Sequence, residues 1–128
     1  MIVKQIEFVV PDLEEEAAAE AEEIFTIVEY NPDPSGGYKA FYEFLFQEIK
    51  YPKQAIRSGI EGKVFVQFVV NKNGELTDFI IARGIGQGCD EEAIRVLRKA
   101  PRWQPGKQRG KPVKVRMMMP IQFTLMEH

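Results

Sequence analysis

The sequence predicts an α+β domain in which a three-stranded antiparallel sheet carries two helices packed on one face. Three observations predict this class in a chain of 128 residues, of which 45% are hydrophobic. Two strand-like runs flank a hairpin signal, Asn71-Lys-Asn-Gly74, where Asn and Gly tolerate positive φ. Two segments space their apolar residues as helices do, and a last segment alternates them as a strand does. The predicted strands are 62–71, 75–83 and 112–125, and the predicted helices are 38–50 and 90–100.

The first helix follows a strong break from Pro32 to Gly37, which holds two prolines and a Gly-Gly pair. Its main apolar face has helical spacing and consists of Phe41, Phe44, Leu45 and Ile49. A second row is aromatic and consists of Tyr38, Tyr42 and Phe46. Aromatic rows on helices usually pack inward, so both rows are expected in the core. Pro52 suits the first turn of a short helix at 53–58, which Gly59 ends.

The middle of the chain predicts two strands, the second helix and a turn. The strand at 62–71 is apolar on both faces, so we expect it in the centre of the sheet, with 75–83 returning antiparallel beside it. Asp90 is a good N-cap for the second helix, which Pro101 stops. Trp103 is expected as a buried anchor within a turn at 103–106, and a polar loop is expected at 107–111.

The last strand has the cleanest pattern in the chain, a period of two over seven positions. Its inward residues are predicted to be Val113, Val115, Met117, Met119, Ile121 and Phe123, and its outward residues Lys114, Arg116, Met118 and Gln122. Pro120 lies inside the run, and proline cannot donate to a sheet ladder. We therefore place this strand at the edge of the sheet, where free backbone groups are able to recruit another strand. Such pairing is expected to be strongest before Pro120, from Val113 to Met119.

Charge divides the chain into a leader and a body. Residues 1–31 hold nine acids and one base, whereas residues 32–128 hold ten acids and sixteen bases. The leader has few large apolar residues, so we interpret 1–31 as a solvated acidic linker, with a short strand or apolar latch at 24–28, and 32–128 as the folded domain. The net charge of −2 argues against a nucleic-acid partner. No apolar run approaches the ~20 residues of a membrane span, and no signal peptide is visible.

Catalytic and metal sites find little support. The one histidine is terminal His128 and the one cysteine is Cys89, so His-based catalysis and Cys-cluster metal sites are not expected, and no cofactor is predicted. The Gly84–Gly88 loop precedes a helix, as phosphate-binding loops do, but Asp90, Glu91 and Glu92 would repel phosphate there. We interpret the loop as a connector. A small enzyme using this loop is kept as an alternative that nucleotide titration would test.

The chain from Tyr51 onward resembles a known family in the order and spacing of its motifs. These are Tyr51-Pro52-x-x-Ala55, Gly59-Ile60-x-Gly62-x-Val64-x-Val66-x-Phe68-x-Val70, Asn73-Gly74, Asp90-x-x-Ala93, Trp103-x-Pro105-Gly106, Gly110-Lys-Pro-Val113 and Pro120-Ile-x-Phe123. They resemble the C-terminal periplasmic domain of the TonB energy transducer. The preceding segment, with Pro34-x-Gly36-Gly37 and the Phe-rich helix, is similar to TonB proteins of Bacteroidetes type.

The resemblance implies a binding function rather than catalysis. Similar proteins are anchored in the inner membrane, are energised by the ExbB–ExbD proton channel, and capture the TonB box of an outer-membrane transporter as an added strand. The anchor would lie outside this chain, and the domain would be periplasmic. The implied protein-binding residues are Val113, Lys114, Val115, Arg116, Met117, Met118, Met119, Ile121, Gln122 and Phe123, together with Gln47, Lys50, Tyr51 and Pro52. A TolA-like or sensor-appended interaction domain is the alternative, and the free edge is also able to pair with a second copy of the chain.

Overall fold

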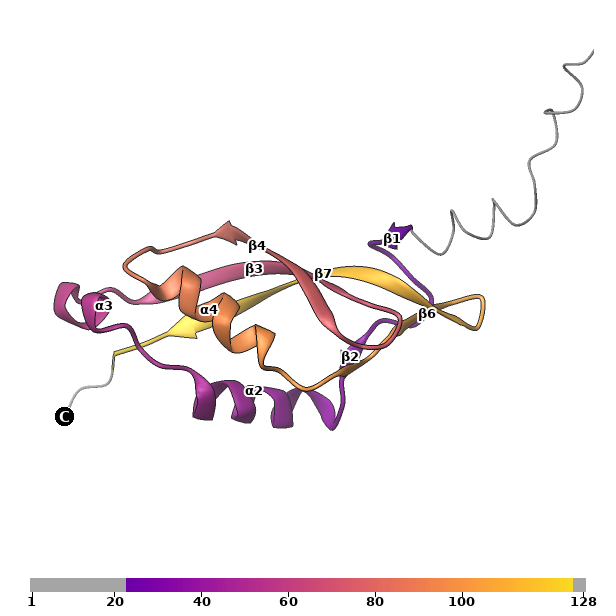
Figure 1. The fold of residues 1–128 in the computed structure, drawn as a ribbon, viewed down its shortest axis with the longest axis horizontal. Helices are drawn as coiled ribbons and strands as arrows, with labels where there is room; N and C mark the ends of the chain where they lie inside the picture. The colour runs from indigo at the N-terminus through magenta and orange to yellow at the C-terminus, as the bar shows by residue number, and fades with distance from the viewer. Residues whose placement is uncertain (1–22, 126–128) are drawn as a thin grey trace, which may run out of the picture.

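The computed structural model describes residues 23–125. Its elements are β1 (Ile24–Phe25), β2 (Asp33–Pro34), α2 (Gly37–Glu48), α3 (Lys53–Ser58), β3 (Gly62–Val70), β4 (Leu76–Arg83), α4 (Cys89–Arg98), β5 (Trp103–Gln104), β6 (Gly106–Gln108) and β7 (Lys111–Phe123). The long strands β3, β4 and β7 form the sheet, and α2 and α4 lie on one side of it (Figure 1). The predicted α+β class, with two helices on one face, is therefore confirmed.

The sheet is built around β3. The strand order is β1-β7-β3-β4, so β3 lies between its two long neighbours, as its apolar character predicted, and it is antiparallel to both. The β3–β7 ladder runs unbroken from Gly62 opposite Phe123 to Val70 opposite Val115. Because directly opposite residues share a face, this register places Val64, Val66 and Phe68 of β3 on the same side as Met119 and Ile121 of β7, where all five pack in the core with the helices. Val69 is buried on the other face.

Short strands enlarge the sheet beyond the three that were predicted. β1 pairs with β7 in parallel at Lys114 and Val115, and β6 pairs with the start of β7 in an antiparallel hairpin. The hairpin turns at Arg109 and Gly110, both with positive φ, so the loop predicted at 107–111 is wrong. The short strand or apolar latch expected at 24–28 is found as β1. Strands of two or three residues such as β2, β5 and β6 show no measurable alternation, which is why the sequence pattern does not reveal them.

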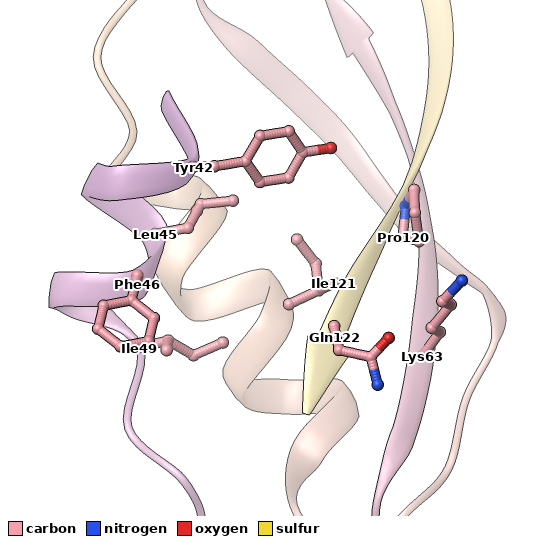
Figure 2. A pocket seen from close by; sticks show the side chains of 8 residues that line it. All are labelled: Tyr42, Leu45, Phe46, Ile49, Lys63, Pro120, Ile121 and Gln122. Atoms are coloured by element: carbon pink, nitrogen blue, oxygen red, sulfur yellow. The ribbon is translucent and has the colours of Figure 1, made fainter. Parts of the chain in front are cut away.

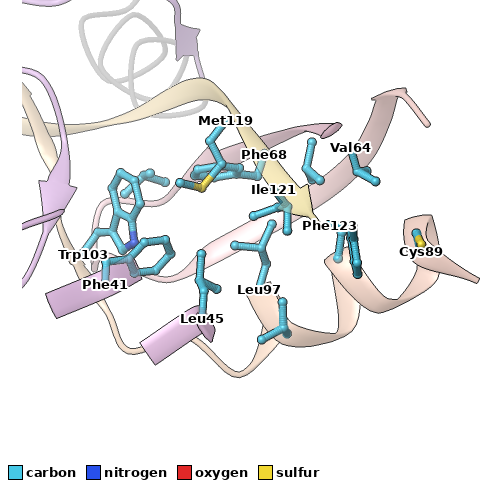
Figure 3. Packing of buried hydrophobic residues seen from close by; sticks show 14 of the residues in the cluster. Phe41, Leu45, Val64, Phe68, Cys89, Leu97, Trp103, Met119, Ile121 and Phe123 are labelled. Atoms are coloured by element: carbon cyan, nitrogen blue, oxygen red, sulfur yellow. The ribbon is translucent and has the colours of Figure 1, made fainter. Parts of the chain in front are cut away.

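Trp103 is the buried anchor that the sequence predicted, with 3% of its surface exposed. Its ring meets Phe41 and Phe68 edge to face, with ring centroids 5.2 and 5.5 Å apart (Figure 3). The predicted turn at 103–106 is wrong, because Trp103–Gln104 forms β5 and pairs with β2. The backbone N–H of Trp103 also donates to the Gly74 carbonyl over 2.9 Å, so the Asn71–Gly74 hairpin and β5 meet directly. A Cβ on Gly74 would lie 2.0 Å from the Trp103 oxygen, so this position requires glycine.

Part of the predicted acidic linker packs on the domain. β1 lies along β7, and the backbones of Tyr30 and Lys107 bond to each other in both directions. The Glu29 carboxylate accepts from the Arg109 N–H, and the Glu29 N–H donates to the Gln108 side chain over 3.0 Å. The folded part therefore extends from the predicted boundary at Pro32 back to Ile24. The rest of the predicted linker, residues 1–22, lies outside the described residues.

Candidate functional site

The outer side of β7 is the candidate site, and the pattern of hydrogen bonds shows which backbone groups face it. At the β3–β4 turn the Asn71 N–H donates to the Glu75 carbonyl over 2.8 Å, so the backbone groups of Asn71 point toward β4. Direction alternates along a strand, so those of Val70 point toward β7. Counted back from Val70 in steps of two, the residues of β3 whose backbone groups also point toward β7 are Phe68, Val66 and Val64. The residues of β7 that lie opposite them, and therefore bond to β3, are Met117, Met119 and Ile121.

The intervening residues of β7 point their backbone groups away from β3. β1 pairs there with Lys114, but from Arg116 to Phe123 no strand within residues 23–125 covers this side. The open donors are the N–H groups of Met118 and Gln122. The N–H of Arg116 is used by β1, because Val115 faces β3 and the parallel pairing of Phe25 with Val115 then directs the Phe25 carbonyl to the Arg116 N–H. Only the carbonyl of Arg116 is open. Pro120 has the same outward orientation, so its missing N–H costs the β3–β7 ladder no hydrogen bond. Proline is therefore tolerated at this position, and the predicted edge location of the strand is correct from Arg116 onward.

The start of β7 differs from the sequence prediction. Val113 lies opposite Gly106 of β6, and Lys114 and Val115 lie opposite β1. These short strands shift the available edge toward the C-terminus, from the predicted 113–119 to 116–122. The side-chain pattern follows the prediction, because the six predicted inward residues are buried except for half-buried Met117. Met118 is 54% exposed on the opposite face, where Arg116 and Gln122 are also exposed and Lys114 is half-buried.

The second predicted contact region, Gln47 and Lys50 to Pro52, is mostly tied into the fold. The Tyr51 hydroxyl donates to the Ile60 carbonyl, and its ring meets that of Phe123 edge to face at 5.4 Å. Burial raises the pKa of Tyr51, which keeps this hydroxyl a donor. The Lys50 N–H donates to the Glu92 carboxylate over 2.6 Å.

The other two residues of this region differ in exposure, since Pro52 is half-buried and Gln47 is exposed. Pro52 lies against Gly88, where an added Cβ would approach it to 3.1 Å. Gln47 is exposed on α2 and lines a shallow depression beside Phe46. Tyr51 therefore positions the end of β7, and Gln47 stays accessible.

An apolar groove lies between α2 and the open edge of β7. It has a volume of about 360 Å³ and is lined by Tyr42, Leu45, Phe46 and Ile49 of α2 and by Lys63, Pro120, Ile121 and Gln122 of the sheet (Figure 2). The sequence prediction missed it. It placed the second aromatic row of α2 in the core, but Tyr38, Tyr42 and Phe46 are 45%, 46% and 78% exposed. The spacing of four residues revealed the row, whereas its burial depends on neighbours that lie far away in the sequence.

The glycine loop before α4 binds its own chain. The Asp90 carboxylate accepts from the Ile85 N–H over 2.9 Å and from the Gly86 N–H over 3.3 Å. The prediction that Asp90 is the N-cap of α4 is therefore wrong, because Gly88 occupies that position. Because a carboxylate occupies the loop amides, a phosphate would have to displace a negative charge, which supports the interpretation of the loop as a connector.

Nucleophilic and metal chemistry lack suitable groups in the part of the chain that the structure covers. Cys89 is fully buried, and burial raises the pKa of its thiol. Within residues 23–125, no group of three or more His, Cys, Asp or Glu side chains is placed to hold a metal ion. Helices long and apolar enough to cross a membrane are likewise absent from these residues.

The fold and the open edge define a class of protein: a small α+β domain whose antiparallel sheet leaves one side of a long strand unpaired within residues 23–125. The chain belongs to the family described as Gram-negative bacterial TonB protein C-terminal, whose model matches residues 47–125. Domains of this family are periplasmic interaction domains, and membership supports a role in energy transduction in general. The Bacteroidetes form of the family stays a prediction.

Solved structures agree with this assignment. One solution structure of the TonB C-terminal domain of Helicobacter pylori is 26% identical, with a TM-score of 0.53 over 70% of this chain and 95% of that one. A longer form of the same domain is 20% identical, with a TM-score of 0.53 over 93% of this chain and 100% of that one, and supports the fold alone. Comparison with curated proteins gives no match.

Proposed function

We propose that this domain captures an extended N-terminal segment of an outer-membrane transporter, the TonB box, as a strand added to β7 between Arg116 and Gln122. The observation that carries this proposal is the open row of backbone donors and acceptors on that side of β7. Strand addition uses main-chain hydrogen bonds for affinity and alternate side-chain positions for selectivity.

The edge already accepts one extended apolar segment of this chain. Ile24 and Phe25 pair with Lys114 and Val115 in parallel. A partner strand bound from Arg116 onward would continue where β1 ends, without displacing it. β1 is thus an example of the geometry that we propose for the partner.

The same geometry suits force transmission. A strand that runs alongside β7 would share a load along its length among several hydrogen bonds, and the unbroken β3–β7 ladder would carry that load into the core. In the proposed setting, an inner-membrane anchor is driven by ExbB–ExbD, and the domain pulls on the transporter. A second copy of the chain is able to use the same edge, so dimerisation through β7 would compete with capture.

Backbone methylation of the partner tests this function. The probe is a synthetic peptide of the N-terminal segment of a TonB-dependent transporter from the same genome, with one amide N-methylated at a time. An added strand turns only every second N–H toward β7. We expect methylation to weaken binding about tenfold or more at alternate positions and to have little effect between them, as measured by calorimetry. Equal effects at successive positions would contradict strand addition.

A pair of protein variants makes the complementary test. Met118→Pro removes an outward donor, whereas Met118→Ala shortens the same side chain and keeps the N–H. We expect the proline variant to lose most of its affinity for the peptide and the alanine variant to bind within about threefold of the parent. A folded Met118→Pro domain that binds as tightly as the parent would overturn the assigned edge.

A further inference from the structure

We propose that the groove between α2 and β7 selects the partner strand, by receiving a large apolar side chain from the residue that lies beside Ile121. This inference rests on the proposed function and adds a selectivity site to it. The residues that we assign to this role are Tyr42 and Phe46, which come from a helix outside the sheet.

The position of the groove follows from the geometry of an added strand. Residues directly opposite each other on neighbouring strands place their side chains on the same face of the sheet. A partner residue beside Ile121 would therefore point to the face that carries α2. The groove opens at this point, next to Pro120 and Ile121 (Figure 2). Its sheet side coincides with the open backbone edge, so one peptide is able to use both.

The helix side of the groove exposes apolar surface that a bound side chain would cover. Phe46 is 78% exposed and Tyr42 is 46% exposed. Tyr42 is held by ring contacts to Tyr38 and Phe41, with centroids 6.4 and 6.2 Å away. Phe41 is buried, so this wall is fixed to the core before a ligand arrives. A preformed wall loses little conformational freedom on binding, which favours affinity.

The chemistry of the lining defines the occupant. Leu45, Ile49 and Ile121 supply aliphatic surface, and no carboxylate lines the groove. Lys63 is the cation at its rim, so a basic side chain is disfavoured there. A volume of about 360 Å³ lies at the lower end of ligand pockets, and suits one or two side chains of a peptide. We therefore assign a Leu, Ile, Met or Phe side chain of an extended peptide as the occupant.

A guest-residue series tests the assignment. In the transporter peptide defined above, each position in turn is changed to Ala, Leu or Phe, and affinity is measured for the parent domain, Phe46→Ala and Ile80→Ala. Ile80 is a matched control because it is 55% exposed on β4, at the opposite edge of the sheet. At one position, we expect the parent to prefer Leu or Phe over Ala about tenfold, the usual discrimination of an apolar pocket. Phe46→Ala should reduce this preference below about threefold, whereas Ile80→Ala should keep it.

The outcomes separate the two proposals. If methylation gives the alternating pattern but Phe46→Ala leaves the guest preference unchanged, strand addition stands and the groove assignment is overturned. If the alternating pattern is absent, the proposed function fails first. Circular dichroism and urea titration check that Phe46→Ala is folded. Loss of affinity for every guest by the same factor would also overturn the assignment, because a side-chain pocket must act at one position of the peptide.

Discussion

The two sides of β7 use the same strand in opposite ways. On one side Met117, Met119 and Ile121 bond to β3 in an unbroken ladder, and their side chains line the core. On the other side, Met118 and Gln122 present backbone groups that no strand within residues 23–125 pairs. The closed side builds the fold, and the open side is where we propose that a partner binds. Substitutions on the closed side should therefore change stability, and those on the open side should change binding.

The largest effect is expected in the core beneath the closed side. Trp103→Ala removes an indole that is 3% exposed and packs against Phe41 and Phe68. We expect a loss of about 3–5 kcal/mol in the free energy of unfolding, measured by urea denaturation. A loss below about 1 kcal/mol would mean that the core does not depend on this anchor.

A proline pair compares the two sides directly. Met117→Pro removes a donor to β3, so it should destabilise the domain by about 3 kcal/mol or prevent folding. Met118→Pro removes an outward donor, as Pro120 already does, and should cost less than about 1 kcal/mol. Circular dichroism melting of both variants measures the difference. Equal losses would contradict the assigned hydrogen-bond directions.

A smaller effect concerns pH at the junction of α2 and α4. Partial burial by itself would raise the pKa of Glu92, but hydrogen bonds from Arg95 and from the Lys50 N–H outweigh it and lower this pKa below the ordinary value of 4.5. The stabilisation is therefore present above that value and is lost as pH falls through the lowered one. Glu92→Gln should cost up to about 1 kcal/mol at pH 7 and progressively less as the pH falls toward 3. An equal loss at both pH values would exclude the carboxylate as its source.

The smallest effect on stability is expected at the groove. Phe46 is mostly exposed, so Phe46→Ala should change the free energy of unfolding by less than about 0.5 kcal/mol. Urea titration beside the parent domain measures it. A loss above about 2 kcal/mol would show that Phe46 supports the core, and the aromatic row would then be structural.

The comparison of the two sides also shows what the sequence was able to predict. Long elements carry their own signal, so the alternation in β7, the hairpin at Asn71-Lys-Asn-Gly74 and the apolar face of α2 led to the correct class and the correct edge. Contacts between distant segments carry no local signal. The sequence could not predict that β1 covers Lys114 and Val115, or that Asp90 turns to the loop amides instead of capping α4.

The open edge itself illustrates this limit. Pro120 correctly indicated an unpaired side of the strand, because a proline there needs no partner. The available stretch nevertheless begins at Arg116 instead of Val113, since β1 and β6 occupy the earlier residues. The groove was missed for a similar reason: the periodicity of Tyr38, Tyr42 and Phe46 cannot tell whether a sheet face or solvent lies opposite them.

Amide hydrogen exchange by NMR shows whether a partner strand is added to the open side of β7. In the free domain, we expect the amides of Met117, Met119 and Ile121 to exchange slowly and those of Met118 and Gln122 to exchange fast. Addition of the transporter peptide should slow the second set by about tenfold or more, in a period of two along β7. If the peptide binds and the amides of Met118 and Gln122 remain as fast as before, no strand has been added at this edge and strand addition is contradicted.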